Sequence, residues 1–139
     1  MSVLLERAKA IVEREFAKKY EEGECYKLHT YRVMEAMDTE EEQIVALLHD
    51  IIEDTEVSMA DLEGEGFSKT ILGAVEDLTK GNSIRYFDYI EDLSLNPLAA
   101  KVKLADLRHN SDLTRLACVD DAARERAKKY AKAIEMLTK

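Results

Sequence analysis

Four side chains that can bind a metal or move a proton fall within residues 49–54, which read His-Asp-Ile-Ile-Glu-Asp. They are His49, Asp50, Glu53 and Asp54. The apolar pattern around them is helical, and on a helix residues four apart share a face. His49 therefore pairs with Glu53, and Asp50 pairs with Asp54. A purely structural turn has little use for an imidazole and three carboxylates among leucines and isoleucines, whereas a hydrolytic metal centre needs such groups.

A second set of candidate ligands lies elsewhere in the chain. Asp106 borders the apolar face of a long predicted helix, and a carboxylate near a core is costly unless it is paired, hydrogen-bonded or bound to a metal. His29 occupies a similar position on another predicted helix. If His29, His49, Asp50 and Asp106 converge from three helices, they form a mixed nitrogen and oxygen site. Such a site suits Mn²⁺, Fe²⁺ or Zn²⁺ better than Ca²⁺.

The elements that must position these groups are all predicted to be helices. Thr39, Ser58, Ser68 and the Asn96-Pro97 pair are typical helix starts. The polar stretch 18–24 predicts a loop. Apolar periodicity predicts helices over residues 2–19, 25–37, 40–52, 58–64, 68–78, 84–93, 97–117 and from 120 or 121 to the C-terminus. We therefore expect an all-α fold of roughly seven to nine helices in one domain that spans residues 1–139.

Composition narrows the class of protein. The chain has 139 residues, of which 46% are hydrophobic, so we expect a folded core rather than disorder. Its net charge of −9 disfavours nucleic acid as the main partner, because phosphate backbones need a basic face. No apolar run is long enough to span a bilayer, no signal peptide is evident, and Cys25 and Cys118 form no disulfide or metal pattern. We expect a cytoplasmic protein without a membrane partner.

The order of these motifs resembles the HD-domain metal phosphohydrolases. Within that superfamily, residues 47–55 and 103–110 resemble the hydrolase domain of RelA/SpoT-type enzymes, which remove pyrophosphate from the 3′ position of (p)ppGpp. The segment 26–29, Tyr-Lys-Leu-His, resembles the one that holds that family's first histidine ligand. The resemblance covers roughly residues 4–137. It implies a single HD-domain helical bundle in a small, stand-alone hydrolase.

The resemblance also implies roles for individual residues. Glu53 and Asp54 would lie beside the metal and position or deprotonate the attacking water. Asn110 could hydrogen-bond a ribose or phosphate, and Lys18 and Lys19 are the nearest candidates to hold anionic phosphate. The substrate would be a small nucleotide. One divalent ion, Mn²⁺ before Fe²⁺, Zn²⁺ or Mg²⁺, would be held by His29, His49, Asp50 and Asp106.

Three positions depart from the RelA/SpoT pattern. Lys18-Lys19 stands where that family has Arg-Lys, and lysine lacks the flat guanidinium that stacks on a base. Thr30 replaces the proline after the first histidine, and Leu107 replaces the arginine after the metal aspartate. These changes concern substrate recognition and leave the metal pattern intact.

Other interpretations remain open at this level. The chain could be a phosphomonoesterase that acts on nucleoside monophosphates or NADPH, or a nucleotide-binding sensor without catalysis. Lys18 and Lys19 are also typical of a solvated charge pair. We expect Tyr86 and Tyr89 to serve packing and His109 to be structural. The sequence does not indicate the oligomeric state.

Overall fold

The chain folds as a bundle of helices arranged around one central helix. The computed structural model describes residues 3–17, 20–21, 24–81, 83–112 and 119–138. These residues form nine helices and one two-stranded hairpin. The helices are α1 (Val3–Phe16), α2 (Tyr26–Glu35), α3 (Glu40–Leu48), α4 (Ile51–Asp54), α5 (Met59–Gly64), α6 (Lys69–Leu78), α7 (Tyr86–Leu93), α8 (Pro97–Asn110) and α9 (Asp121–Thr138).

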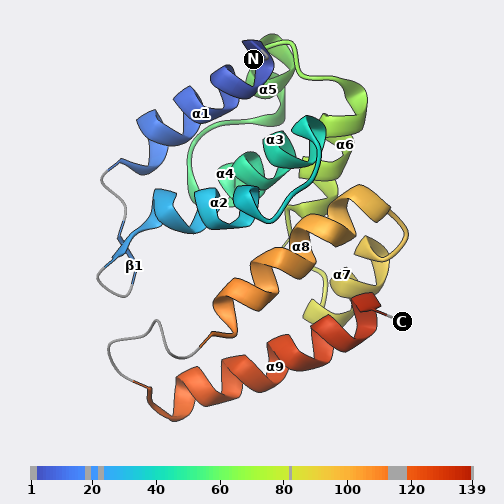
Figure 1. Ribbon diagram of the computed structural model, residues 1–139. Coiled ribbons are helices and arrows are strands. Elements are labelled where there is room, and N and C mark those ends of the chain that lie inside the picture. Colours follow the sequence, from blue (N-terminus) through green and yellow to red (C-terminus); the bar gives the residue numbers. More distant parts are fainter. Residues whose placement is uncertain (1–2, 18–19, 22–23, 82, 113–118, 139) are drawn as a thin grey trace.

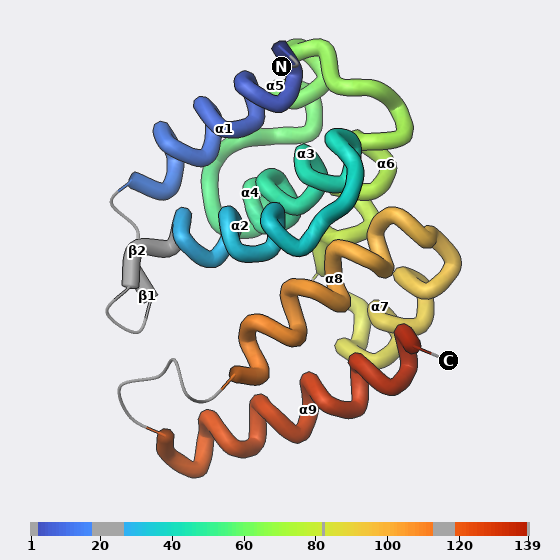
Figure 2. The backbone as a smooth tube through the Cα atoms, viewed as in Figure 1, coloured from blue at the N-terminus to red at the C-terminus, as the bar shows by residue number. Residues whose placement is uncertain are grey.

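The all-α class predicted from the sequence is confirmed, with one small addition. Strands β1 (Tyr20–Glu21) and β2 (Glu24–Cys25) form a short antiparallel hairpin directly before α2 (Figure 1), where the sequence predicted a loop. Figure 2 shows the backbone of α2 beside α3. Several helix ends differ by one to three residues, and two differences are larger. Helix α8 ends at Asn110 instead of continuing to 117, and the predicted helix 40–52 is divided into α3 and α4.

Local capping explains why several helices begin where they do. Thr39 and Glu42 form a reciprocal capping box at the start of α3, and Ser58 and Asp61 do the same for α5. The Asn96 side chain accepts hydrogen bonds from the first turn of α8, which Pro97 opens. These caps satisfy backbone donors that a helix leaves unpaired. The predicted starts of these helices are therefore confirmed.

Helix α3 is the centre of the bundle. It packs against α1, α2, α6 and α8, and Figure 1 shows it enclosed by these neighbours. Its last five residues, 44–48, are all buried, and the large side chains among them each contribute about 1.5–3 kcal/mol on burial. Because this helix end is fixed in the core, the residues that follow Leu48 are held rigidly and start from a buried position.

Helix α8 is the second element that positions the site. It contacts α2 and α3 on one side and α9 on the other (Figure 1). Its buried residues include Val102 and Leu107, which join the main apolar core, and also the carboxylate Asp106. No helix in the described part of the chain is long and apolar enough to cross a membrane.

Candidate metal centre

Four predicted ligands meet at one point between α2, α3 and α8. His29 comes from α2, Asp106 comes from α8, and His49 and Asp50 come from the junction of α3 with α4. Each offers one ligand atom, and these four atoms all lie within 4.8 Å of one another. Three of the residues are buried and Asp50 is half-buried. The convergence expected from motif order is therefore present.

The junction between α3 and α4 explains how two consecutive residues reach the same site. In a regular helix, successive side chains diverge by about 100°. Asp50 leaves the helical region with φ −109° and ψ 1°, and α4 starts at the next residue. This break brings Asp50 Oδ2 to 3.0 Å from His49 Nε2. The uninterrupted helix predicted for residues 40–52 was wrong, because the site needs both side chains on one side.

His49 is held in the orientation that a metal requires. Its Nδ1–H donates to the Ala46 carbonyl oxygen at 2.5 Å, so Nε2 is the nitrogen directed to the ligand cluster. Nε2 is buried and has no partner in hydrogen-bond geometry among the described residues. Burial opposes protonation of the ring, but the charges of Asp50 and Asp106 outweigh it and raise the pKa of His49. The surroundings thus attract a cation to this nitrogen.

His29 is held from behind by a residue that the sequence did not assign to the site. Its Nε2 lies 2.8 Å from Asp106 Oδ1, and its Nδ1 lies 2.7 Å from Nδ1 of His109. When Nε2 binds a metal, the ring proton lies on Nδ1 and can donate to Nδ1 of His109. His109 therefore belongs to the metal centre as an orienting partner, where sequence analysis assigned it a structural role. Its spacing of three residues from Asp106 was the available signal.

Asp106 is the most heavily bonded of the four. Besides His29, its carboxylate accepts hydrogen bonds from Lys103 Nζ at 3.1 Å and from Asn110 Nδ2 at 3.1 Å. Burial favours the neutral acid, but Lys103 and His49 outweigh it and hold the pKa of Asp106 well below its usual value. This carboxylate is therefore ionised and ready to bind a cation.

Lys103 is a second contributor that sequence analysis left without a role. Its side chain is only 15% exposed, and its ammonium lies over the Tyr89 ring at 5.5 Å from the centroid. Burial opposes the charge of Lys103, but Asp106 outweighs it and raises its pKa. Tyr89 is itself buried, as predicted, and its hydroxyl donates to the Leu78 carbonyl oxygen. Lys103 fixes the orientation of Asp106 from the same helix, three residues away.

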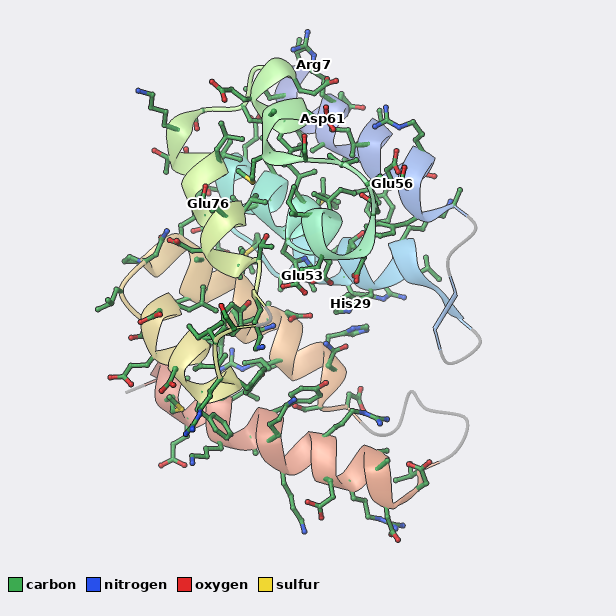
Figure 3. The ribbon with its side chains drawn as sticks, turned by 180° about the vertical axis from the view of Figure 1, so that it is seen from behind. Arg7, His29, Glu53, Glu56, Asp61 and Glu76 are labelled. Atoms are coloured by element: carbon green, nitrogen blue, oxygen red, sulfur yellow. The ribbon has the colours of Figure 1, made fainter. Side chains whose placement is uncertain are left out.

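Glu53 and Asp54 lie at the end of α4, and both are exposed. The backbone N–H of Lys80 donates to Glu53 Oε1. Although Glu53 keeps exposed atoms, partial burial and the nearby charge of Asp50 raise the pKa of its carboxyl against the opposing hydrogen bond from Lys80. Figure 3 shows Glu53 and His29 directed to the same side, toward α8. The catalytic roles of Glu53 and Asp54 stay predictions.

The predicted substrate contacts have mixed outcomes. Asn110 is directed to Asp106, and its contact with substrate stays a prediction. Lys18 and Lys19 lie outside the described residues. Of the other departures from the RelA/SpoT pattern, Thr30 and Leu107 are both buried, and the Thr30 hydroxyl donates to the Lys27 carbonyl oxygen.

The donor set fits a divalent transition metal. It offers two imidazole nitrogens and two carboxylates, and one of the nitrogens is a buried atom without a hydrogen bond. Each imidazole also has a partner on its other nitrogen, which is the usual arrangement around a metal. The four residues can therefore hold a metal ion, as the sequence predicted.

Comparison with solved structures gives a close match of fold. The chain is similar to a metazoan ortholog of SpoT, described as hydrolysing ppGpp and playing a role in starvation responses. The TM-score is 0.81 with 22% sequence identity over 99% of this chain and 86% of that one. No protein-family model and no curated protein matches the chain. The likeness confirms the predicted all-α helical bundle, and at this identity it speaks for the fold alone.

Proposed function

We propose that this protein is a metal-dependent phosphohydrolase that removes pyrophosphate from (p)ppGpp or a close analogue. The observation that carries this proposal is the convergence of His29, His49, Asp50 and Asp106 within 4.8 Å. The shared fold with a ppGpp-hydrolysing SpoT ortholog supports the substrate class. We propose Mn²⁺ as the ion, with Fe²⁺, Zn²⁺ and Mg²⁺ as alternatives, because the site mixes imidazole and carboxylate ligands.

The ligand residues prepare the site before any substrate arrives. A divalent cation held there supplies Lewis-acid chemistry, because it acidifies water and polarises a phosphoryl oxygen. The hydrogen bond from His49 to Ala46 and the contact of His29 with His109 fix the two rings. Lys103 and Asn110 fix the carboxylate of Asp106. The ligand geometry therefore costs little reorganisation on binding.

Glu53 is the proposed proton carrier. Its raised pKa brings the carboxyl closer to neutral pH, where a group can accept a proton from water and return it to a leaving oxygen. The Lys80 N–H holds one carboxylate oxygen, and the other has no hydrogen bond from Lys80. Asp54, next in sequence, is the second candidate for positioning the water. Both are exposed, and they follow Asp50 within one helical turn.

Substrate binding requires local positive charge, because the chain as a whole is acidic with a net charge of −9. Lys18 and Lys19 are proposed to hold phosphate, and Asn110 is proposed to contact the ribose or a phosphate. The lysine pair replaces the Arg-Lys of RelA/SpoT-type enzymes, so no guanidinium from this segment stacks on the nucleotide base. These lysines are therefore the positions on which nucleotide preference depends.

A substrate panel tests the proposal directly. Protein treated with chelator and then reloaded with Mn²⁺ is assayed on (p)ppGpp, NADPH, nucleoside monophosphates and nucleoside triphosphates, with separate detection of pyrophosphate and orthophosphate. We expect pyrophosphate and a 5′-phosphorylated guanosine nucleotide from (p)ppGpp. Chelation should abolish this activity and Mn²⁺ should restore it. Arg124→Ala, an exposed change on α9, is the matched control for a neutral substitution.

Two results would replace the proposal. Release of orthophosphate from nucleoside monophosphates or NADPH, with (p)ppGpp intact, would establish the phosphomonoesterase alternative. Saturable nucleotide binding without turnover of any substrate in the panel would establish the sensor alternative.

A further inference from the structure

A pocket apart from the four metal ligands lies between α2 and α8, on a different face of α8 from the one that carries Asp106. We name it the α2–α8 pocket. It has a volume of about 510 Å³, within the range of small-molecule sites. None of the four metal ligands, and neither Glu53 nor Asp54, lines it. The residues that do are Arg32, Ala36, Met37, Lys101, Leu104, Ala105, Arg108 and His109.

The chemistry of this lining is unusual for the chain. Every ionisable residue that lines the pocket is basic, although the protein has 29 acidic residues against 20 lysines and arginines. The remaining lining residues are alanine, leucine and methionine, which form an apolar floor. A cleft with one sign of charge raises the local concentration of ligands of opposite charge. The lining thus suits an anion that also carries an apolar body.

The available positive charge is concentrated at Arg108. Lys101 is already bound to Asp38 at 2.7 Å and to Glu42 at 2.9 Å, so its charge is balanced. Arg32 has a weaker contact of 3.5 Å with Glu35, and both are exposed. Arg108 is exposed and makes no hydrogen bond or ion pair with any described residue. A guanidinium without an internal partner can form a bidentate pair with a phosphate.

We propose that the α2–α8 pocket is a second ligand site, distinct from the hydrolytic centre, for a phosphorylated small molecule with a flat apolar body such as a nucleoside phosphate. Arg108 binds the phosphate, and the floor formed by Ala36, Leu104 and Ala105 receives the base. His109 lies at the wall between the two sites, because it lines the pocket while its Nδ1 contacts His29. An occupant therefore touches the residue that orients a metal ligand.

Nuclear magnetic resonance (NMR) on the full-length, Zn²⁺-loaded protein tests this site without relying on turnover. Zn²⁺ is diamagnetic, so the amide signals of α2 and α8 stay sharp. AMP is titrated as the probe, and adenosine and inorganic phosphate are titrated separately. We expect AMP to shift the amides of residues 32–37 and 101–109 saturably, and each fragment alone to bind at least tenfold more weakly.

Matched variants locate the probe. Arg108→Ala should weaken AMP binding about tenfold or more, because a hydrogen bond to a charged group is lost. Arg124→Ala makes the same chemical change on α9 and should leave the affinity within about twofold. Ala36→Trp fills the pocket from an exposed position and should abolish the shifts while Zn²⁺ binding persists.

The alternative outcomes are equally clear. Adenosine as tight as AMP would overturn the role of charge, and phosphate as tight as AMP would overturn the role of the floor. Equal affinities in Arg108→Ala and Arg124→Ala, or shifts confined to residues outside 32–37 and 101–109, would overturn the site itself. None of these results depends on hydrolysis, so the proposed function is tested separately.

Discussion

The metal centre and the α2–α8 pocket lie against the same two helices and have opposite chemistry. The metal centre is mostly buried, gathers carboxylates and attracts a cation. The pocket gathers basic side chains, two of them exposed arginines, and suits an anion. Helix α8 produces this difference by spacing alone, because Lys103, Asp106 and Asn110 follow one face while Lys101, Leu104 and Arg108 follow another.

The two regions also differ in what fixes their side chains. In the metal centre His29, His49 and Asp106 each have a specific hydrogen bond to a described residue, and the helix break at Asp50 places its carboxylate beside His49. In the pocket Arg108 has no such partner. A metal needs a fixed geometry of several ligands, whereas an anion can be met by a flexible guanidinium. Substitutions on the two sides of α8 should therefore have separable effects.

The largest effect is expected for His49→Ala. This change removes a ligand whose Nε2 is buried without a hydrogen bond. Loss of a direct ligand should weaken Mn²⁺ binding by more than the about 10–100-fold that removal of an orienting partner costs. Elemental analysis after dialysis measures the bound metal. Stoichiometric Mn²⁺ in His49→Ala would show that the ligand assignment is wrong, while AMP binding in the pocket should be unchanged.

Next in size is the effect of Glu53→Gln. Loss of a general acid–base group should lower kcat by about 10²–10⁴-fold with metal content and fold retained. The pKa of Glu53 is raised, so a base at this position loses activity as pH falls through a value above that of an ordinary glutamate. The acidic limb of the pH–rate profile should therefore lie at higher pH than for a free glutamate, and it should disappear in Glu53→Gln.

Asp54→Asn is the companion variant for this prediction. Near-normal turnover in both variants would remove the pair from the mechanism. A loss in Asp54→Asn alone would transfer the proton-carrying role to Asp54.

Sequence analysis identified the four residues that converge as candidate ligands and most helix starts, and the reason is local. Caps such as Thr39 with Glu42 depend on residues three apart, and the His-Asp pair is recognisable as a motif. Other features depend on contacts between distant segments. His29 and His109 are 80 residues apart in sequence, and the pocket forms only when α2 meets α8. The break at Asp50 was missed because the apolar periodicity of residues 44–52 continues through it, so the local pattern indicates one helix.

Lys103→Met should have an intermediate effect and sharpens the comparison within α8. Methionine keeps much of the side-chain volume and removes the hydrogen bond to Asp106. A hydrogen bond to a charged group contributes about 1.5–3 kcal/mol, so the free energy of unfolding should fall by that amount in the chelated protein. Mn²⁺ should restore part of the loss, because it replaces the cation beside Asp106. Urea denaturation with and without Mn²⁺ measures both values. An equal loss in the two conditions would mean that Lys103 and the metal do not act on the same carboxylate.

The smallest effect is expected at His109, the one residue that the two regions share. His109→Leu removes the acceptor for the Nδ1–H of His29, so the His29 ring loses its fixed orientation. Mn²⁺ affinity should fall about 10–100-fold, as for other orienting partners. His109→Asn retains an oxygen acceptor near the place of Nδ1 and should recover most of the affinity.

Competition with a chelator measures the affinity, and the absorption spectrum of the Co²⁺-loaded protein reports the ligand geometry. A merely structural role predicts that both variants lose stability without a change in the Co²⁺ spectrum. Equal Mn²⁺ affinity in the leucine and asparagine variants would show that His109 does not orient His29. No residue would then connect the α2–α8 pocket to the metal centre.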